Sequence, residues 1–227
     1  MKVPFIPADK LKRQYGVFGH FYSLQLPAVA PQKCRSVLEI SATTAGNSPI
    51  ADAVFVMMNP GSSRPVQETS HSVSSDQVSG MLANLVPTVP DMTQYQVMRI
   101  MYFKGWQNVK VINLSDLRDP QSGAFAERYV QLEKDSGTTV HSIFSPERAA
   151  QLKRYLSRKP GGPIVCAWGV SDDLNPLIER ASKSLAQEMG VTGLEKPGNA
   201  GRYFHPLPSL QRQREQWVIE MLERLNA

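Results

Sequence analysis

Residues 54–63 read VFVMMNPGSS. The apolar run ends at an asparagine, and Pro60 then stops a strand because proline has no backbone N–H to donate. Gly61 permits a sharp turn or a close approach of the backbone to a ligand. The pattern predicts a buried strand over residues 53–58 that delivers Asn59 to the edge of an α/β sheet. Open α/β sheets bind ligands just outside the carboxyl ends of their strands, so Asn59 is a candidate site residue.

Length and composition are those of an ordinary globular protein. The 227 residues, 41% of them hydrophobic, can bury one sizeable core. The net charge of +5 favours an anionic partner without requiring one. Two cysteines, Cys34 and Cys166, are too few for a disulfide framework or a cysteine-ligated iron–sulfur cluster. With no signal peptide and no apolar run long enough to span a bilayer, we expect a cytoplasmic protein without membrane contact.

Helices and strands are expected to alternate along most of the chain. Asp91 and Gln94 have the spacing of a capping box, which predicts that a helix follows over residues 92–104. Further helices are expected from the Ser145 cap to about Arg158, from 174 to about Gly190, and over 217–225. Strands are expected over 36–41 at an edge of the sheet, over 109–114 and over 164–167, with a turn at 45–49.

These elements predict a three-layer α/β/α fold with a central, mainly parallel sheet of four to five strands. Residues 1–35 show no clear periodicity and are expected to form an arm packed on a single α/β domain over residues 36–227. Residues 61–90 are rich in Ser, Pro, Gly and Thr. We expect them to form a long loop, which in a compact domain is usually functional or mobile.

Four strand ends carry polar or special residues. They are Asn59-Pro60-Gly61, Asn113, Trp168-Gly169 and the segment 205–209, which reads HPLPS. Parallel strands joined by right-handed crossovers bring such ends to one edge of the sheet. Two amides and one imidazole make a poor metal site but a good site for a polar heterocycle. No Walker-type loop, Ser-His-Asp order or metal-ligand spacing competes with this interpretation.

In order and spacing, these segments resemble the uracil-DNA glycosylase superfamily. "NPGSS" resembles the first motif of its mismatch-specific and single-strand-selective branches, and "VKVINL" resembles the strand whose asparagine reads the base. "IVCAWG" resembles the strand before the last helix, and "HPLPSL" resembles the histidine-containing leucine loop. Residues 53–210 also resemble a bacterial and phage family of uncharacterised proteins with Asn-Pro, Val-Asn-Leu, Ala-Trp-Gly and His-Pro-Leu motifs.

The resemblance implies a uracil-DNA glycosylase-like fold and a DNA glycosylase that acts without a cofactor or metal. Such an enzyme hydrolyses the N-glycosidic bond of a flipped-out base and leaves an abasic site. Asn59 would position the attacking water, and His205 would donate a hydrogen bond to the base carbonyl. Where the uracil-specific branch has a tyrosine that blocks pyrimidine C5, this chain has Gly61. We therefore expect uracil or 5-modified pyrimidines as substrates, including hypermodified bases of phage DNA in a defence role.

The other candidate residues fall into two groups. Base binding is expected from Pro60, Gly61, Asn113, Trp168, Gly169 and His71, and DNA contact from Ser62, Ser63, Arg64, Leu207, Ser209, Leu210 and Arg212. Leu207 and Leu210 both remain candidates for the apolar wedge that fills the vacated stack. The expected partner is DNA, bound by a monomer.

Three alternatives stay open. One is a hydrolase that processes free nucleosides or nucleotides without DNA. Another is a catalytically silent module that binds nucleic acid. The third is a different hydrolase in which the carboxylate of Asp116 acts as the base.

Overall fold

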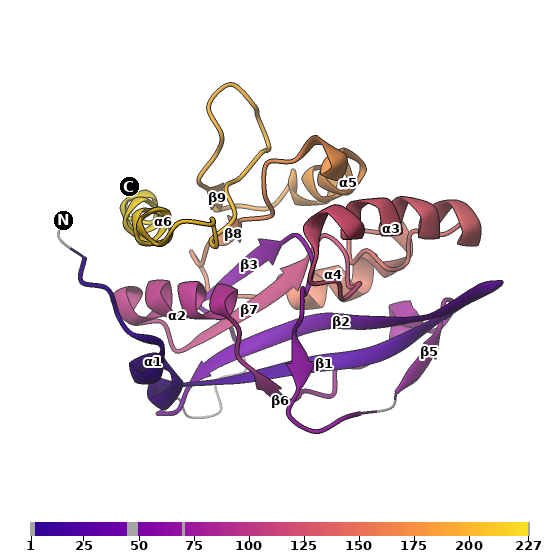
Figure 1. Cartoon of the computed structure of the whole chain (residues 1–227), viewed down its shortest axis with the longest axis horizontal. Helices are drawn as coiled ribbons and strands as arrows, with labels where there is room; N and C mark the ends of the chain where they lie inside the picture. Colours follow the sequence, from indigo (N-terminus) through magenta and orange to yellow (C-terminus); the bar gives the residue numbers. More distant parts are fainter. Residues whose placement is uncertain (1–2, 45–49, 70, 227) are drawn as a thin grey trace.

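A computed structural model describes residues 3–44, 50–69 and 71–226, and within them the chain forms one mixed sheet of nine strands (Figure 1). The strands are β1 (Tyr15–Leu26), β2 (Val29–Ala42), β3 (Ala53–Met57), β4 (Arg64–Pro65), β5 (Ser72–Ser74), β6 (Val86–Val89), β7 (Asn108–Asn113), β8 (Ile164–Cys166) and β9 (Val191–Gly193). Their order is β4-β6-β1-β2-β7-β3-β8-β9, and β5 pairs with β1.

The sheet has a parallel half and a largely antiparallel half. Strands β7, β3, β8 and β9 run parallel, whereas β2 pairs antiparallel with both β7 and β1. The strands expected over 53–58, 109–114 and 164–167 are confirmed as β3, β7 and β8. The expectation of a mainly parallel sheet of four to five strands is wrong. The strand expected over 36–41 at an edge lies inside the sheet as part of β2, between β1 and β7.

The N-terminal segment differs most from its expected form. Residues 15–35 do not lie on the domain as an arm, because β1 and the first half of β2 form a long hairpin within the sheet. Their side chains are buried at most positions of β1, so strict apolar–polar alternation is absent. A register shift between His20 and Phe21 also breaks the two-residue period on which recognition of a strand depends.

The polar segment 61–90 is likewise more regular than expected. It contains β4, β5, β6 and a 3₁₀ turn over Val78–Gly80. These strands have two to four residues each, which is too short to give a periodic signal. The turn expected at 45–49 falls outside the described residues.

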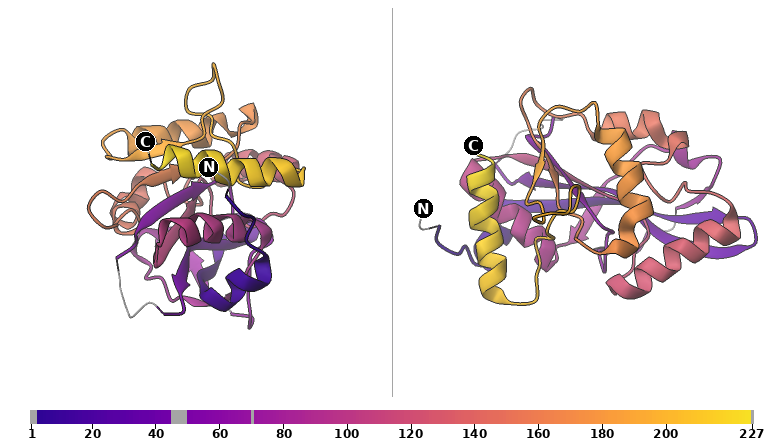
Figure 2. Two further views of the ribbon diagram at one scale, coloured as in Figure 1. Left: turned by 90° about the vertical axis from the view of Figure 1, so that its left-hand side faces the viewer. Right: turned by 90° about the horizontal axis from the view of Figure 1, so that it is seen from above.

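Helices lie on both faces of the sheet (Figure 2). The first group is α1 (Ala8–Gln14), α2 (Met92–Lys104) and α6 (Gln211–Arg224), and the second is α3 (Ser122–Ser136), α4 (Ala149–Tyr155) and α5 (Asn175–Leu185). Helix α2 has the predicted bounds, and its Asp91–Gln94 capping box is present. Helix α4 follows a 3₁₀ turn over Pro146–Arg148, whereas α3 was not expected. Among the described residues, no helix is long and apolar enough to cross a bilayer.

Candidate functional site

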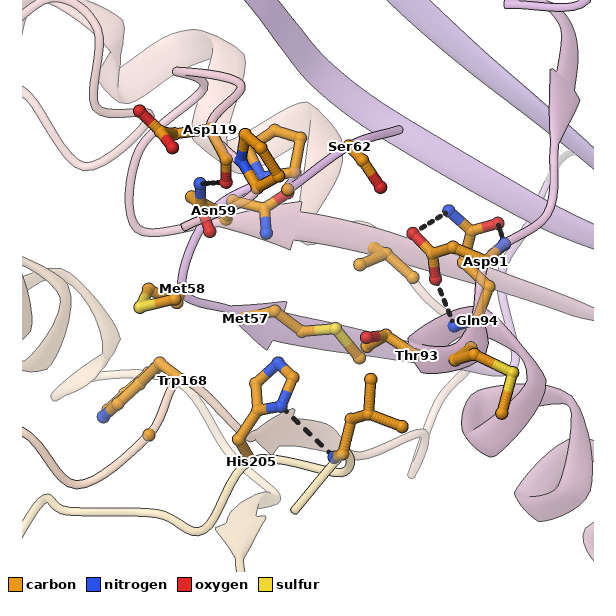
Figure 3. A pocket seen from close by; sticks show the side chains of 18 of the residues that line it. Met57, Met58, Asn59, Ser62, Asp91, Thr93, Gln94, Asp119, Trp168 and His205 are labelled. Atoms are coloured by element: carbon orange, nitrogen blue, oxygen red, sulfur yellow. Dashed lines mark hydrogen bonds between the residues drawn. The ribbon is translucent and has the colours of Figure 1, made fainter. Parts of the chain in front are cut away.

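A cavity of about 700 Å³ lies at the carboxyl ends of β3, β7 and β8 (Figure 3). The residues that the sequence predicted for a site and that line this cavity are Asn59, Pro60, Gly61, Ser62, Asn113, Trp168, Gly169, His205 and Leu207. They come from four segments far apart in sequence. The parallel half of the sheet thus brings the motifs after β3, β7 and β8 together as expected. His205 and Leu207 were also expected at a strand end, but they lie in the irregular segment between β9 and α6.

The Asn59 side chain has a fixed orientation. Its Nδ2 donates to the backbone carbonyl of Asp119 over 2.8 Å and to that of Leu117 over 3.4 Å. Two carbonyl acceptors can only be met by the NH₂ end of an amide, so the Oδ1 end is the one turned away from them. In Figure 3 this oxygen points toward the interior of the cavity. Asn59 therefore presents an acceptor, which suits the binding of a water molecule.

His205 is a neutral hydrogen-bond donor. Its Nδ1 accepts the backbone N–H of Leu207 over 3.2 Å, so the proton of the neutral ring lies on Nε2. Burial lowers the pKa of His205 to about 4, and the ring is uncharged at neutral pH. Nε2 points into the cavity (Figure 3). A donor of this kind can stabilise negative charge that develops on a ligand.

The loop that carries His205 is tied to two other elements. The backbone N–H of Gly169 donates to the carbonyl of Tyr203 over 2.8 Å, which joins the end of β8 to this loop. On the other side, Nε2 of Gln96 on α2 donates to the carbonyl of Pro206 over 2.8 Å. These bonds flank the histidine and hold its ring over the cavity without help from a ligand.

Asn113 meets a residue that the sequence did not single out. Its Oδ1 accepts Nη2 of Arg35 over 2.8 Å, and both side chains line the cavity while being almost fully buried. Nδ2 of Asn113 and Nε of Arg35 have no hydrogen-bond partner. Burial lowers the pKa of Arg35 to about 10, which still leaves the guanidinium charged at neutral pH. No motif marked Arg35, because the strand expected in this region began at residue 36 and the preceding residues were assigned to an arm.

The walls of the cavity are largely apolar. Trp168 is buried, and its Nε1 donates to the carbonyl of Gly201 over 3.0 Å, away from the strand ends. Apart from the His205 imidazole, its indole is the one aromatic ring among the described lining residues. The sequence interpretation also missed the lining methionines Met57, Met58 and Met92 and the carboxylates of Asp91 and Asp119.

Six predicted site residues do not line the cavity. They are His71, Ser63, Arg64, Ser209, Leu210 and Arg212. The ring of His71 lies beside that of His20, with 5.7 Å between centroids, so the structure does not bring it to the other base-binding candidates. Ser63 is buried, which removes it from the surface that DNA would contact. Leu210, Arg212, Arg64 and Ser209 are exposed.

Asp116 is enclosed in the protein rather than in the cavity. Its carboxylate is fully buried, forms an ion pair with Arg148 over 2.8 Å and accepts the hydroxyl of Tyr22 over 2.8 Å. It does not line the cavity. A carboxylate in this position stabilises the interior and has no path to a substrate in the cavity, which argues against Asp116 as a general base.

A second constellation has the spacing of a catalytic triad. The Ser115 hydroxyl lies 2.8 Å from Nδ1 of His141, whose Nε2 lies 2.8 Å from Glu133. Ser115 is fully buried, however, and none of the three lines the cavity. A nucleophile needs access to its substrate, so this chain of hydrogen bonds is a structural one.

The comparisons with known proteins leave the site to be interpreted from its own chemistry. No model of a protein family matches the chain, and neither a curated protein nor a solved structure matches it. Among the described residues, no group of three or more His, Cys, Asp or Glu side chains is placed to hold a metal ion.

Proposed function

We propose that the protein is a DNA glycosylase with a uracil-DNA glycosylase-like fold. It hydrolyses the N-glycosidic bond of a flipped-out uracil or 5-modified pyrimidine and leaves an abasic site. The observation that carries the proposal is the pairing of two opposite functions in one cavity. Asn59 presents an acceptor for water, and His205 presents a neutral N–H donor for the leaving base.

The reaction needs both groups. The oxygen of water bonds to C1′ of the sugar, the C1′–N1 bond breaks, and its electron pair leaves with the base. The proton lost by water reaches the released base through solvent. Asn59 orients the water rather than deprotonating it, because an amide is not a base at neutral pH. His205 stabilises the negative charge on the base carbonyl, and loss of one such donor typically raises the barrier by about 2.7–4 kcal/mol.

The size and lining of the cavity also support a base as ligand. A volume of about 700 Å³ falls within the range of small-molecule sites. Trp168 and the two methionines Met57 and Met58 offer flat or polarisable apolar surface to a heterocycle. The exposed Arg64 and Arg212 are proposed to bind DNA phosphates outside the cavity.

An enzyme on free nucleosides is the second candidate. Asp91 and Asp119 line the cavity. Carboxylates accept hydrogen bonds from sugar hydroxyls and repel phosphates, which favours a nucleoside over a DNA strand.

One experiment separates these candidates. Oligonucleotides that carry uracil, 5-hydroxymethyluracil or cytosine at one position are incubated with the protein and then cleaved with alkali at abasic sites, beside a parallel incubation with free nucleosides. We expect cleavage at the first two bases, and activity that falls steeply with salt because phosphate contacts release counterions. Hydrolysis of free nucleosides alone, insensitive to salt, would support the second candidate. If the protein binds DNA but releases no base, it is a catalytically silent module that binds nucleic acid.

A further inference from the structure

An irregularity in the sheet places Arg35 at the cavity. Along β2, Val37 pairs with His20 and Arg35 pairs with Phe21, so Ser36 is the extra residue of a bulge. Val37 packs in the hydrophobic cluster that includes α3, α4 and α5, and the Ser36 hydroxyl lies 3.0 Å from that of Tyr155 on α4. Strict alternation would put Arg35 on the same face as Val37. The bulge turns it to the other face, and such bulges are common beside active sites.

The charge of Arg35 has no counterion close by. Arg35 forms no ion pair with any described residue, and its one side-chain hydrogen bond goes to the neutral amide of Asn113. The carboxylates of Asp91 and Asp116 act on it only at longer range. Asp91 is engaged by Gln94, and Asp116 is paired with Arg148. A buried charge without a partner is costly, and proteins keep it chiefly where function needs it.

We propose that Arg35, together with Asn113, recognises a negatively charged oxygen on the ligand, and that Arg35 makes the cavity select such ligands. Arg35 holds Oδ1 of Asn113, so the amide offers its NH₂ end to other partners. The Nε of Arg35 and the Nδ2 of Asn113 are two donors without acceptors. Both donors are buried beside the cavity. A ligand edge that carries oxygen acceptors and reaches them would satisfy both, whereas an amino group would leave them unpaired.

This inference rests on the proposed function and narrows its substrate class. The matching base is a pyrimidine with a 4-oxo group, on which negative charge accumulates as the base leaves. A 5-substituent with an acidic group would supply a full negative charge at the same end. The shared chemistry is an anionic oxygen that meets a guanidinium.

Binding of free bases tests the inference without relying on catalysis. Titration calorimetry on the full chain would use cytosine, uracil and 5-carboxyuracil, with benzoate as an anion that is not a pyrimidine. We expect 5-carboxyuracil to bind most tightly and cytosine most weakly. Arg35→Met should weaken binding of 5-carboxyuracil at least about tenfold, as expected for one charge-assisted hydrogen bond, and leave that of cytosine nearly unchanged.

Thermal stability separates a ligand-binding role from a structural one. If Arg35 serves a ligand, replacing an unpaired buried charge with Met leaves the Tm unchanged or raises it. The matched control is Arg148→Met. This variant leaves the buried carboxylate of Asp116 without its ion-pair partner and should lower the Tm. If the Tm of Arg35→Met falls as much as that of Arg148→Met, Arg35 has a structural role and the inference is overturned.

The binding outcomes also separate this inference from the proposed function. If the pyrimidines bind wild type and Arg35→Met alike, the role of Arg35 is wrong while a base-binding cavity remains. If benzoate alone binds in an Arg35-dependent manner, the anion site stands and the pyrimidine glycosylase does not. If none of the four probes binds, the inference is overturned.

Discussion

The backbone N–H of Leu207 donates to Nδ1 of His205 over 3.2 Å, and this bond decides which ring nitrogen faces the cavity with a proton. The other ring nitrogen, Nε2, can then act as a donor throughout the neutral pH range, because burial keeps the pKa of His205 near 4. On the opposite wall, the amide of Asn59 is held with its acceptor toward the cavity. Both groups hold these orientations without a ligand, which is the preorganisation that the proposed reaction would require.

His205→Ala should slow base release by about 10²–10³, because the leaving base loses one preorganised donor. The Tm should change little, since the loop is also held by the bonds of Gly169 and Gln96. Single-turnover rates on a uracil oligonucleotide provide the measurement. His71→Ala is the matched control, since His71 lies outside the cavity, and it should retain full activity. A loss of Tm in proportion to activity would assign His205 a purely structural role.

The free energy of unfolding should fall as the pH drops from 6.5 to 5. Burial lowers the pKa of His205 and of His20 to about 4, whereas both titrate near 6.5 in the unfolded chain. In this window the unfolded state binds more protons, so stability rises with pH and levels off above 6.5. Each such histidine contributes a slope of up to about 1.4 kcal/mol per pH unit. Urea denaturation of His20→Asn should show a shallower slope, and a slope equal to that of wild type would contradict the prediction.

Asn59→Ala should abolish base release and leave DNA binding within a few fold, because in the proposed mechanism Asn59 orients water rather than holding a phosphate. Gel-shift titrations measure binding, and alkali cleavage of the oligonucleotide measures release. Asn199→Ala serves as the matched control, since Asn199 is exposed and does not line the cavity. Near-normal turnover by Asn59→Ala would remove this residue from the mechanism.

Gly61→Tyr should eliminate release of 5-substituted pyrimidines while sparing uracil. A Cβ added at Gly61 would meet no atom within 4 Å, so space beside this residue is open in the wild type and a ring would fill it. Steric exclusion of this kind is steep. The backbone φ of +59° strains any other residue, so Gly61→Ala is the control for strain without bulk. The Gly61→Ala variant should release uracil and 5-substituted pyrimidines in about the same ratio as the wild-type protein. If the wild-type protein releases only unsubstituted uracil, the prediction that the cavity admits 5-substituted pyrimidines is wrong.

Leu210→Ala should slow release from duplex DNA by about tenfold and leave release from single strands unchanged. Leu210 is 49% exposed at the start of α6, whereas Leu207 lines the cavity. An exposed apolar side chain can fill the stack that a flipped base leaves, and that stack exists only in a duplex. Leu207→Ala should instead affect both substrates equally. If only Leu207→Ala shows a defect that is specific to duplex DNA, Leu207 rather than Leu210 is the residue that fills the vacated stack.

Short-range signals in the sequence determined the parts of the fold that depend on neighbouring residues. The Asp91–Gln94 capping box defined α2, because its hydrogen bonds form within one turn. The apolar run before Asn59 defined β3, because a strand buried on both faces reads as continuous hydrophobic residues. The three predicted strands β3, β7 and β8 also predicted that Asn59, Asn113 and Trp168 lie close together, since the carboxyl ends of parallel strands meet at one edge of the sheet.

Tertiary structure alone decided the rest. The hairpin of β1 and β2 depends on pairing between strands and contains a bulge, so its own residues show no clean period. That bulge turns Arg35 to the cavity, although Arg35 lies 78 residues from its partner Asn113. The tautomer of His205 and the amide orientation of Asn59 likewise depend on where backbone groups lie in space. Sequence spacing therefore determined which groups lie at the ends of the parallel strands, because that depends on short segments. Strand pairing and hydrogen bonds across the fold determined that Arg35 joins them and which atom of each group faces the cavity.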